Sequence, residues 1–145
     1  MIRLVLVLLL ALIAPAIAQT PPQEPFLRIE AGGHIGAVPH VSVDASGRLL
    51  ATAGYDKTVR LWSLPDGKQI GVLRPPIGPD QEGEIYAVAI SPDGRRGFAA
   101  GATGGSWDGT FSIYLFDTRR GTMLGRLPGL PNVRCEKKGN LYCYL

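Results

Sequence analysis

The chain has 145 residues, of which 46% are hydrophobic and 19% charged, and its formal net charge is +3. This apolar content and low net charge exclude an intrinsically disordered chain. The 19 glycines and 12 prolines make up about a fifth of the sequence and favour many short strands joined by turns over a helical bundle. The 2 cysteines are too few for a disulfide-dense scaffold.

Residues 1–18 have the pattern of a secretory signal peptide. Arg3 gives a positive start, residues 4–13 are an unbroken apolar run, and residues 16–18 are Ala-Ile-Ala, which fits a signal-peptidase site. The apolar run is shorter than the about 20 residues that span a bilayer, although a retained membrane anchor is the alternative. We expect cleavage near Ala18, a periplasmic or secreted mature protein, and membrane contact only during export.

Residues 19–25 form a proline-rich spacer that cannot pair in a sheet and is expected to stay extended. Residues 26–30 then favour a short leading strand that brings the chain into the folded part. The folded domain is therefore predicted to begin near Phe26.

Two similar segments follow the leading strand. A shift of 47 positions places residues 44–48 on residues 91–95, and a shift of 54 places residues 62–67 on residues 116–121. The difference of seven positions indicates an insertion in the second copy, which we locate in the glycine-rich stretch 102–109. Such self-similarity at a fixed period is typical of repeat architectures.

Each copy divides into four short strands separated by turn residues. The unit length of about 40–50 residues with four antiparallel strands is that of a β-propeller blade. We therefore predict an all-β fold in which two blades form an incomplete ring, followed by residues 132–145 as an incomplete third blade or an aberrant tail. The expected strands are 37–43, 49–53, 58–63 and 69–73 in the first blade (31–76), and 85–90, 96–100, 111–117 and 122–127 in the second blade (77–131).

The first copy resembles a blade of the WD-repeat family. Gly33 and His34 stand before the first strand, and Trp62 ends the third strand 28 residues after His34. Thr52 in the second strand and Asp56 in the following turn complete the family pattern. The resemblance implies a buried structural tetrad, joined by hydrogen bonds, of His34, Thr52, Asp56 and Trp62.

The chemistry of these side chains supports the same tetrad. A buried imidazole needs a partner for each nitrogen, and a hydroxyl can donate and accept at once. His34, Thr52 and Asp56 also have the residue types of a hydrolytic triad, but threonine is a poor nucleophile away from a chain terminus. We therefore favour the structural role, and we interpret His40 as a packing or surface residue.

The second copy departs from the family pattern at three of these positions. Gln81 stands in the histidine position, Ala99 in the hydroxyl position and Phe116 in the tryptophan position. We therefore expect that the internal polar chain cannot form and that this blade relies on apolar packing.

The inserted stretch is the candidate partner-binding loop, through Ser106, Trp107 and Asp108. An aromatic side chain on an exposed glycine-rich tip can anchor an interface, and loops commonly carry function. The alternative is that Trp107 folds back over the edge of the blade.

The tail contains both cysteines, Cys135 and Cys143. One interpretation is a hairpin that turns at residues 138–140 and carries a Cys135–Cys143 disulfide in an oxidising compartment. The other, which we favour, is a truncated or frame-shifted reading frame after Val133.

The sequence contains no signature of a catalytic, metal or cofactor site. The basic pairs at residues 95–96 and 119–120 flank turns, and we interpret them as solvent-exposed charges. The basic residues are spread along the chain, which argues against a nucleic-acid partner. We expect a non-enzymatic exported scaffold, as the resemblance implies, that binds a protein or peptide partner or self-associates to complete the propeller. The alternative is the propeller portion of a larger exported enzyme or multidomain protein whose catalytic part lies elsewhere.

Overall fold

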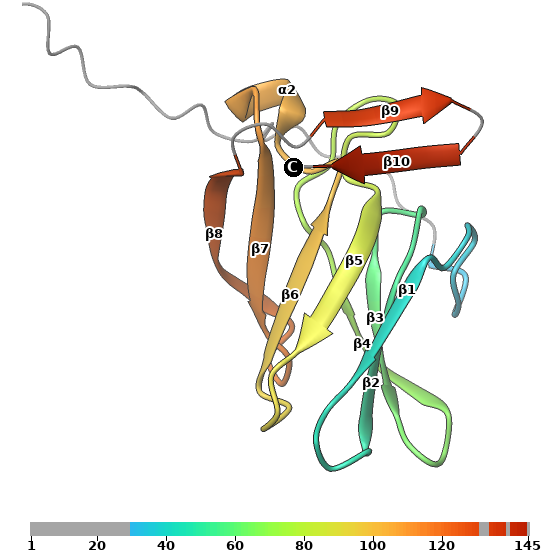
Figure 1. The fold of residues 1–145 in the computed structure, drawn as a ribbon. Coiled ribbons are helices and arrows are strands. Elements are labelled where there is room, and N and C mark those ends of the chain that lie inside the picture. The colour runs from blue at the N-terminus through green and yellow to red at the C-terminus, as the bar shows by residue number, and fades with distance from the viewer. Residues whose placement is uncertain (1–29, 131–133, 139, 145) are drawn as a thin grey trace, which may run out of the picture.

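A computed structural model describes residues 30–130, 134–138 and 140–144, in which two four-stranded antiparallel sheets stand side by side (Figure 1). Each sheet is a meander, in which strands next to each other in sequence pair with each other, so the predicted all-β fold of two blades is confirmed. Blade 1 consists of β1 (His40–Val43), β2 (Leu49–Ala53), β3 (Val59–Ser63) and β4 (Lys68–Leu73), and blade 2 of β5 (Ile85–Ile90), β6 (Arg96–Gly101), β7 (Phe111–Asp117) and β8 (Thr122–Leu130).

The first strand is shorter than predicted, because it begins at His40 instead of residue 37. Pro39 has no backbone N–H to donate to a sheet. The carbonyl of Ala37 accepts a hydrogen bond of 3.0 Å from the backbone N–H of Tyr55, in the turn between β2 and β3. This segment is therefore held by the turn and not by the sheet.

The β1–β2 turn shows why aspartate and glycine recur between the strands. The Asp44 carboxylate accepts hydrogen bonds from the backbone N–H groups of Arg48 at 2.8 Å and Leu49 at 2.9 Å. Gly47 has a φ of 67°, in the left-handed region that favours glycine. In the β5–β6 turn of blade 2, Ser91 takes the part of Asp44, because its hydroxyl accepts from the backbone N–H of Arg96 at 2.9 Å, and Gly94 takes the part of Gly47 with a φ of 70°.

The hydrophobic core lies between the two blades. One face of blade 1 and the facing side of blade 2 form a single buried cluster, so neither blade has a core of its own. This arrangement is typical of stacked repeats, which bury their apolar faces against their neighbours. The cluster consists of Ala51, Ala53, Val59, Leu61 and Leu73 from blade 1, and Ile85, Val88, Ala99, Tyr114 and Phe116 from blade 2.

Polar side chains of β1 also bind the edge of blade 2. The backbone N–H of Ile90 donates to the Ser42 hydroxyl at 3.1 Å, and the N–H of Val88 lies 3.4 Å from Nδ1 of His40. These contacts provide acceptors for N–H groups of an edge strand, which has no neighbouring strand on that side. His40 is thus an interblade contact.

A separate two-stranded antiparallel sheet follows the blades, formed by β9 (Arg134–Lys138) and β10 (Asn140–Tyr144) (Figure 1). The hairpin, which is the less favoured of the two sequence interpretations of the tail, is therefore present, and its register places Cys143 opposite Cys135. The disulfide itself stays a prediction.

Two predicted N-terminal segments, the signal peptide and the spacer, lie outside the described residues, as do residues 26–29 of the leading strand. Within the described residues, no helix is long and apolar enough to cross a membrane.

Candidate functional site

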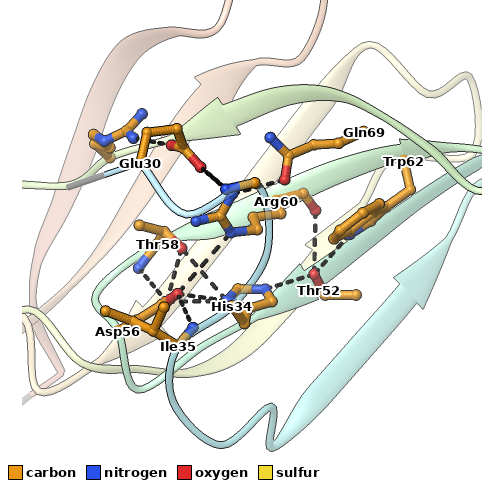
Figure 2. A network of polar contacts seen from close by, with 11 residues as sticks. Glu30, His34, Ile35, Thr52, Asp56, Thr58, Arg60, Trp62 and Gln69 are labelled. Carbon is orange, nitrogen blue, oxygen red and sulfur yellow. Dashed lines mark hydrogen bonds and ion pairs between the residues drawn. The ribbon is translucent and has the colours of Figure 1, made fainter.

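The structure brings the four side chains of the tetrad together on blade 1 (Figure 2). The indole Nε1 of Trp62 donates to the Thr52 hydroxyl at 2.9 Å, and that hydroxyl lies 2.7 Å from Nε2 of His34. The other ring nitrogen, Nδ1, lies 2.9 and 3.0 Å from the two carboxylate oxygens of Asp56. Because an ionised carboxylate only accepts, we assign the imidazole proton to Nδ1, and Nε2 then accepts from the Thr52 hydroxyl.

The carboxylate of Asp56 organises the turn around the tetrad. It accepts hydrogen bonds from the backbone N–H groups of Ile35 and Thr58, each at 3.2 Å, and from the Thr58 hydroxyl at 2.7 Å. Burial raises the pKa of this carboxyl, but the hydrogen bonds from Thr58 and His34 outweigh burial and leave the pKa below its usual value. Asp56 is therefore ionised at neutral pH.

The imidazole and the carboxylate are also packed too closely for a substrate to enter between them. A Cβ added to Gly54 would overlap the His34 ring and the Asp56 carboxylate. The side chains of His34 and Asp56 are almost wholly buried. This geometry suits a structural link between the segment before β1 and the turn after β2.

A buried arginine lies beside the tetrad and was not singled out from the sequence. Arg60, the second residue of β3, donates from Nη1 to Glu30 at 2.6 Å and to Gln69 at 2.7 Å (Figure 2). Arg74 binds the other oxygen of Glu30 at 2.7 Å. The hydrogen bond from Arg60 is the largest of the causes that together lower the pKa of Glu30 to about 2. The signal in the sequence is a charged residue between two apolar residues, Val59 and Leu61, of a strand.

Blade 2 contains a different polar link, so the expectation that it relies on apolar packing alone is wrong. The nearly buried Glu82 carboxylate accepts from the backbone N–H of Gly104 at 2.5 Å. It also accepts from the backbone N–H and the hydroxyl of Ser106, both at 3.0 Å. Glu82 thus joins the segment before β5 to the loop after β6, as the His34–Asp56 pair does in blade 1.

The inserted loop folds into one helical turn, α2 (Gly105–Asp108), and is not an exposed tip. Trp107 is only 5% exposed, so the expected exposed aromatic anchor is wrong, and the alternative in which it folds back is confirmed. The physical reason is the bonding of Glu82 to the start of this turn, together with packing of the indole beside Gly78. Ser106 remains exposed.

Within the described residues, no three or more His, Cys, Asp or Glu side chains lie together in a way that could hold a metal ion.

Comparison with known proteins identifies the family to which the chain belongs. The sequence model of the WD domain, G-beta repeat (WD40), matches residues 27–63 and 67–114. The chain belongs to the WD40-repeat family. WD-repeat proteins typically act as scaffolds for protein interactions.

Several WD-repeat relatives are similar to parts of this chain. Small ribosomal subunit protein RACK1y of Oryza sativa subsp. japonica is 31% identical over 120 residues, which is 81% of this chain and 30% of that protein. Eukaryotic translation initiation factor 3 subunit I of Coccidioides immitis is 37% identical over 89 residues, or 61% of this chain and 24% of the relative. Ribosome biogenesis protein ERB1 of Meyerozyma guilliermondii is 38% identical over 74 residues, or 51% and 9%. The chain therefore spans less than a third of each of these relatives.

Proposed function

We propose that this WD-repeat chain is an exported, non-catalytic scaffold that binds protein or peptide partners, including other copies of itself. The observation that carries the proposal is a pair of apolar outer faces, one on each blade. The buried state of the tetrad supports a non-catalytic role, because His34 and Asp56 already bind each other and neighbouring groups. Export is supported by the signal-peptide pattern of residues 1–18.

The outer face of blade 1 is the side of the sheet that carries the tetrad. Val41 pairs with Thr52 and Val43 pairs with Leu50, so these four side chains lie on one face. Val41 is 53% exposed and Val43 is 46% exposed. Two valines on a sheet face that is open to this degree indicate a surface suited to a partner.

The outer face of blade 2 is likewise apolar. Phe98 pairs with Leu115, and Ile113 pairs with Leu127, on the side opposite the buried Tyr114 and Phe116. Leu127 is 60% exposed, whereas Phe98, Ile113 and Leu115 are half-buried. This face therefore offers a second apolar surface.

The repeat shows that the outer face of each blade is equivalent in sequence to the buried inner face of the other blade. The 47-residue shift places Val41 on the buried Val88 and Ala51 on Phe98. The 54-residue shift places the buried Leu61 on Leu115. The outer face of blade 1 thus corresponds to the inner face of blade 2, and the outer face of blade 2 to the inner face of blade 1.

A second copy can therefore place its blade 1 against the outer face of blade 2 in the manner in which the two blades of one chain meet. Such a head-to-tail contact joins unlike surfaces and produces a ring if the rotation closes. Burial of apolar area, at about 25 cal/mol per Å², provides the driving force.

The test of self-association is the molar mass of the chain in solution, measured by light scattering over a range of concentrations. We expect the wild type to form oligomers and the Val41→Glu/Val43→Glu variant to be monomeric. Ile35→Glu is the matched control, because Ile35 is an exposed aliphatic residue in the segment before the sheet, and we expect it to associate as the wild type does. A wild type that is monomeric at every concentration would overturn self-association.

Export has its own test, which is N-terminal sequencing of the protein recovered from cells that make it. We expect the recovered chain to begin at Gln19. A chain that keeps residues 1–18 and stays in the cytoplasm would contradict export and leave the self-association test unaffected.

A further inference from the structure

The β5–β6 and β7–β8 turns of blade 2 lie at the end of the sheet opposite α2 (Figure 1). Arginines of these two turns line an open hollow, which we call the basic hollow. The hollow has a volume of about 350 Å³ and is lined by Arg95, Asp117, Arg119 and Arg120. Arg95 and the Arg119–Arg120 pair, which lie far apart in sequence and which we first interpreted as solvated charges, therefore contribute to one concave surface.

The backbone under this basic hollow is held in place by hydrogen bonds between the two turns. The N–H of Thr118 donates to the carbonyl of Arg95 at 3.0 Å, and its hydroxyl donates to the carbonyl of Gly94 at 2.5 Å. Within the second turn, the Asp117 carboxylate accepts from the backbone N–H groups of Arg119 and Arg120, both at 2.9 Å. The arginines therefore project from fixed positions.

The guanidinium groups of Arg95 and Arg120 are only weakly engaged by the protein. Arg120 lies 3.6 Å from the Asp117 carboxylate, and Arg95 lies 3.9 Å from that of Asp93, both longer than a hydrogen bond. The side chains of Arg95 and Arg120 are 66% and 79% exposed. Each guanidinium carries five N–H donors, so the hollow presents many donors to an incoming acceptor.

We propose that the basic hollow binds an acidic peptide segment of a partner protein through its glutamate or aspartate carboxylates. This inference rests on the proposed scaffold function and names the chemistry of one partner site. Three arginines and one aspartate leave a net charge of two positive units on the lining, which matches two carboxylates. Arginine binds carboxylates through paired N–H···O bonds, and arginine clusters are a known mode of acidic-motif recognition.

The composition of the hollow favours carboxylates over a nucleic acid. Sequence-independent binding of single strands uses aromatic side chains on which bases stack, and none lines this hollow.

The probe is a fluorescein-labelled hexaglutamate peptide, whose binding to the full chain is measured by fluorescence anisotropy, with hexaglutamine as the uncharged control peptide. We expect the wild type to bind hexaglutamate more weakly as salt increases and not to bind hexaglutamine. Arg95→Gln/Arg120→Gln should weaken binding at least about tenfold, because it removes two of the three positive groups.

The matched control is Arg48→Gln/Lys68→Gln, which removes two exposed charges of blade 1, one in the β1–β2 turn and one at the start of β4, and should change the affinity by less than about twofold. Equal loss of binding in both double variants would overturn the proposal, because net charge alone would then explain it. Tighter binding of a thymidine oligonucleotide than of hexaglutamate would overturn it in favour of a nucleic acid. Loss of peptide binding in Arg95→Gln/Arg120→Gln should leave self-association intact, so the two proposals fail independently.

Discussion

Replacing Thr52 by valine tests the tetrad, because valine keeps the shape of the side chain and removes only its hydroxyl. The substitution leaves Nε1 of Trp62 without its acceptor at 2.9 Å and Nε2 of His34 without its partner at 2.7 Å. A buried polar group without a partner costs about 1–3 kcal/mol. Trp62 is half-buried and can reach water, so its share belongs at the low end. We expect a total loss of about 2–4 kcal/mol, or about 10–25 °C in Tm for a domain of this size.

The assay is thermal and urea unfolding followed by circular dichroism, with Thr52→Ser as the matched control. Serine keeps the hydroxyl and loses one methyl group, which costs about 1 kcal/mol. A double-mutant cycle with Trp62→Phe isolates the Trp62–Thr52 hydrogen bond, and we expect a coupling energy of about 1 kcal/mol. The reasoning is refuted if Thr52→Val and Thr52→Ser unfold within about 0.5 kcal/mol of each other.

Three further predictions concern the polar links and the packing around them. Glu82→Gln should lower stability by about 2 kcal/mol, since an amide NH2 would face a backbone donor; an unchanged urea midpoint would contradict the link. The pKa of Glu30 is lowered to about 2, first by the hydrogen bond from Arg60. The folded pKa lies below the unfolded value, so this stabilisation is present above about pH 4.5 and is lost as pH falls through about 2. Melts across this range should therefore show a shallower acid dependence in Glu30→Gln, and an identical slope would argue against the ion pair. Gly54→Ala should destabilise the fold by at least about 1–3 kcal/mol, whereas Gly33→Ala, where an added Cβ meets nothing within 4 Å, should not; equal effects in urea unfolding would count against the close packing.

The fold was largely predictable because the repeat imposes the same local pattern twice. Apolar alternation and the aspartate–glycine turns predicted eight strands, and the structure changes mainly their ends. The late start at His40 follows from Pro39, whose missing N–H weakens any strand that includes it. Local chemistry therefore determines the strands, and the repeat determines their order.

The tetrad could be placed from sequence because its four residues follow a known spacing. The link through Glu82 could not, because its partners are backbone N–H groups of Gly104 and Ser106, which carry no residue signature. Trp107 was uncertain for the same reason, since its burial depends on the position that Glu82 gives to α2. Interactions with the backbone of an inserted loop are thus visible only in three dimensions.

The basic hollow and the open outer faces could likewise not be predicted from the sequence. The exposure of Val41 or Leu127 cannot be read from a strand pattern, because apolar alternation is the same whether a face is covered or open. Likewise, Arg95 and Arg120 lie close together because the β6–β7 register places Arg96 opposite Asp117 and because Thr118 joins the two turns.

The central claim is that the two outer faces are complementary, and mixing two blocked variants tests it most directly. One variant carries Val41→Glu/Val43→Glu on blade 1, and the other carries Leu127→Glu on blade 2. Each alone should be monomeric by sedimentation velocity, because each lacks one of the two surfaces that a head-to-tail contact needs. The equimolar mixture is predicted to form a one-to-one dimer through the two intact faces. A mixture that sediments only as monomers, from a wild type that does associate, would contradict the account.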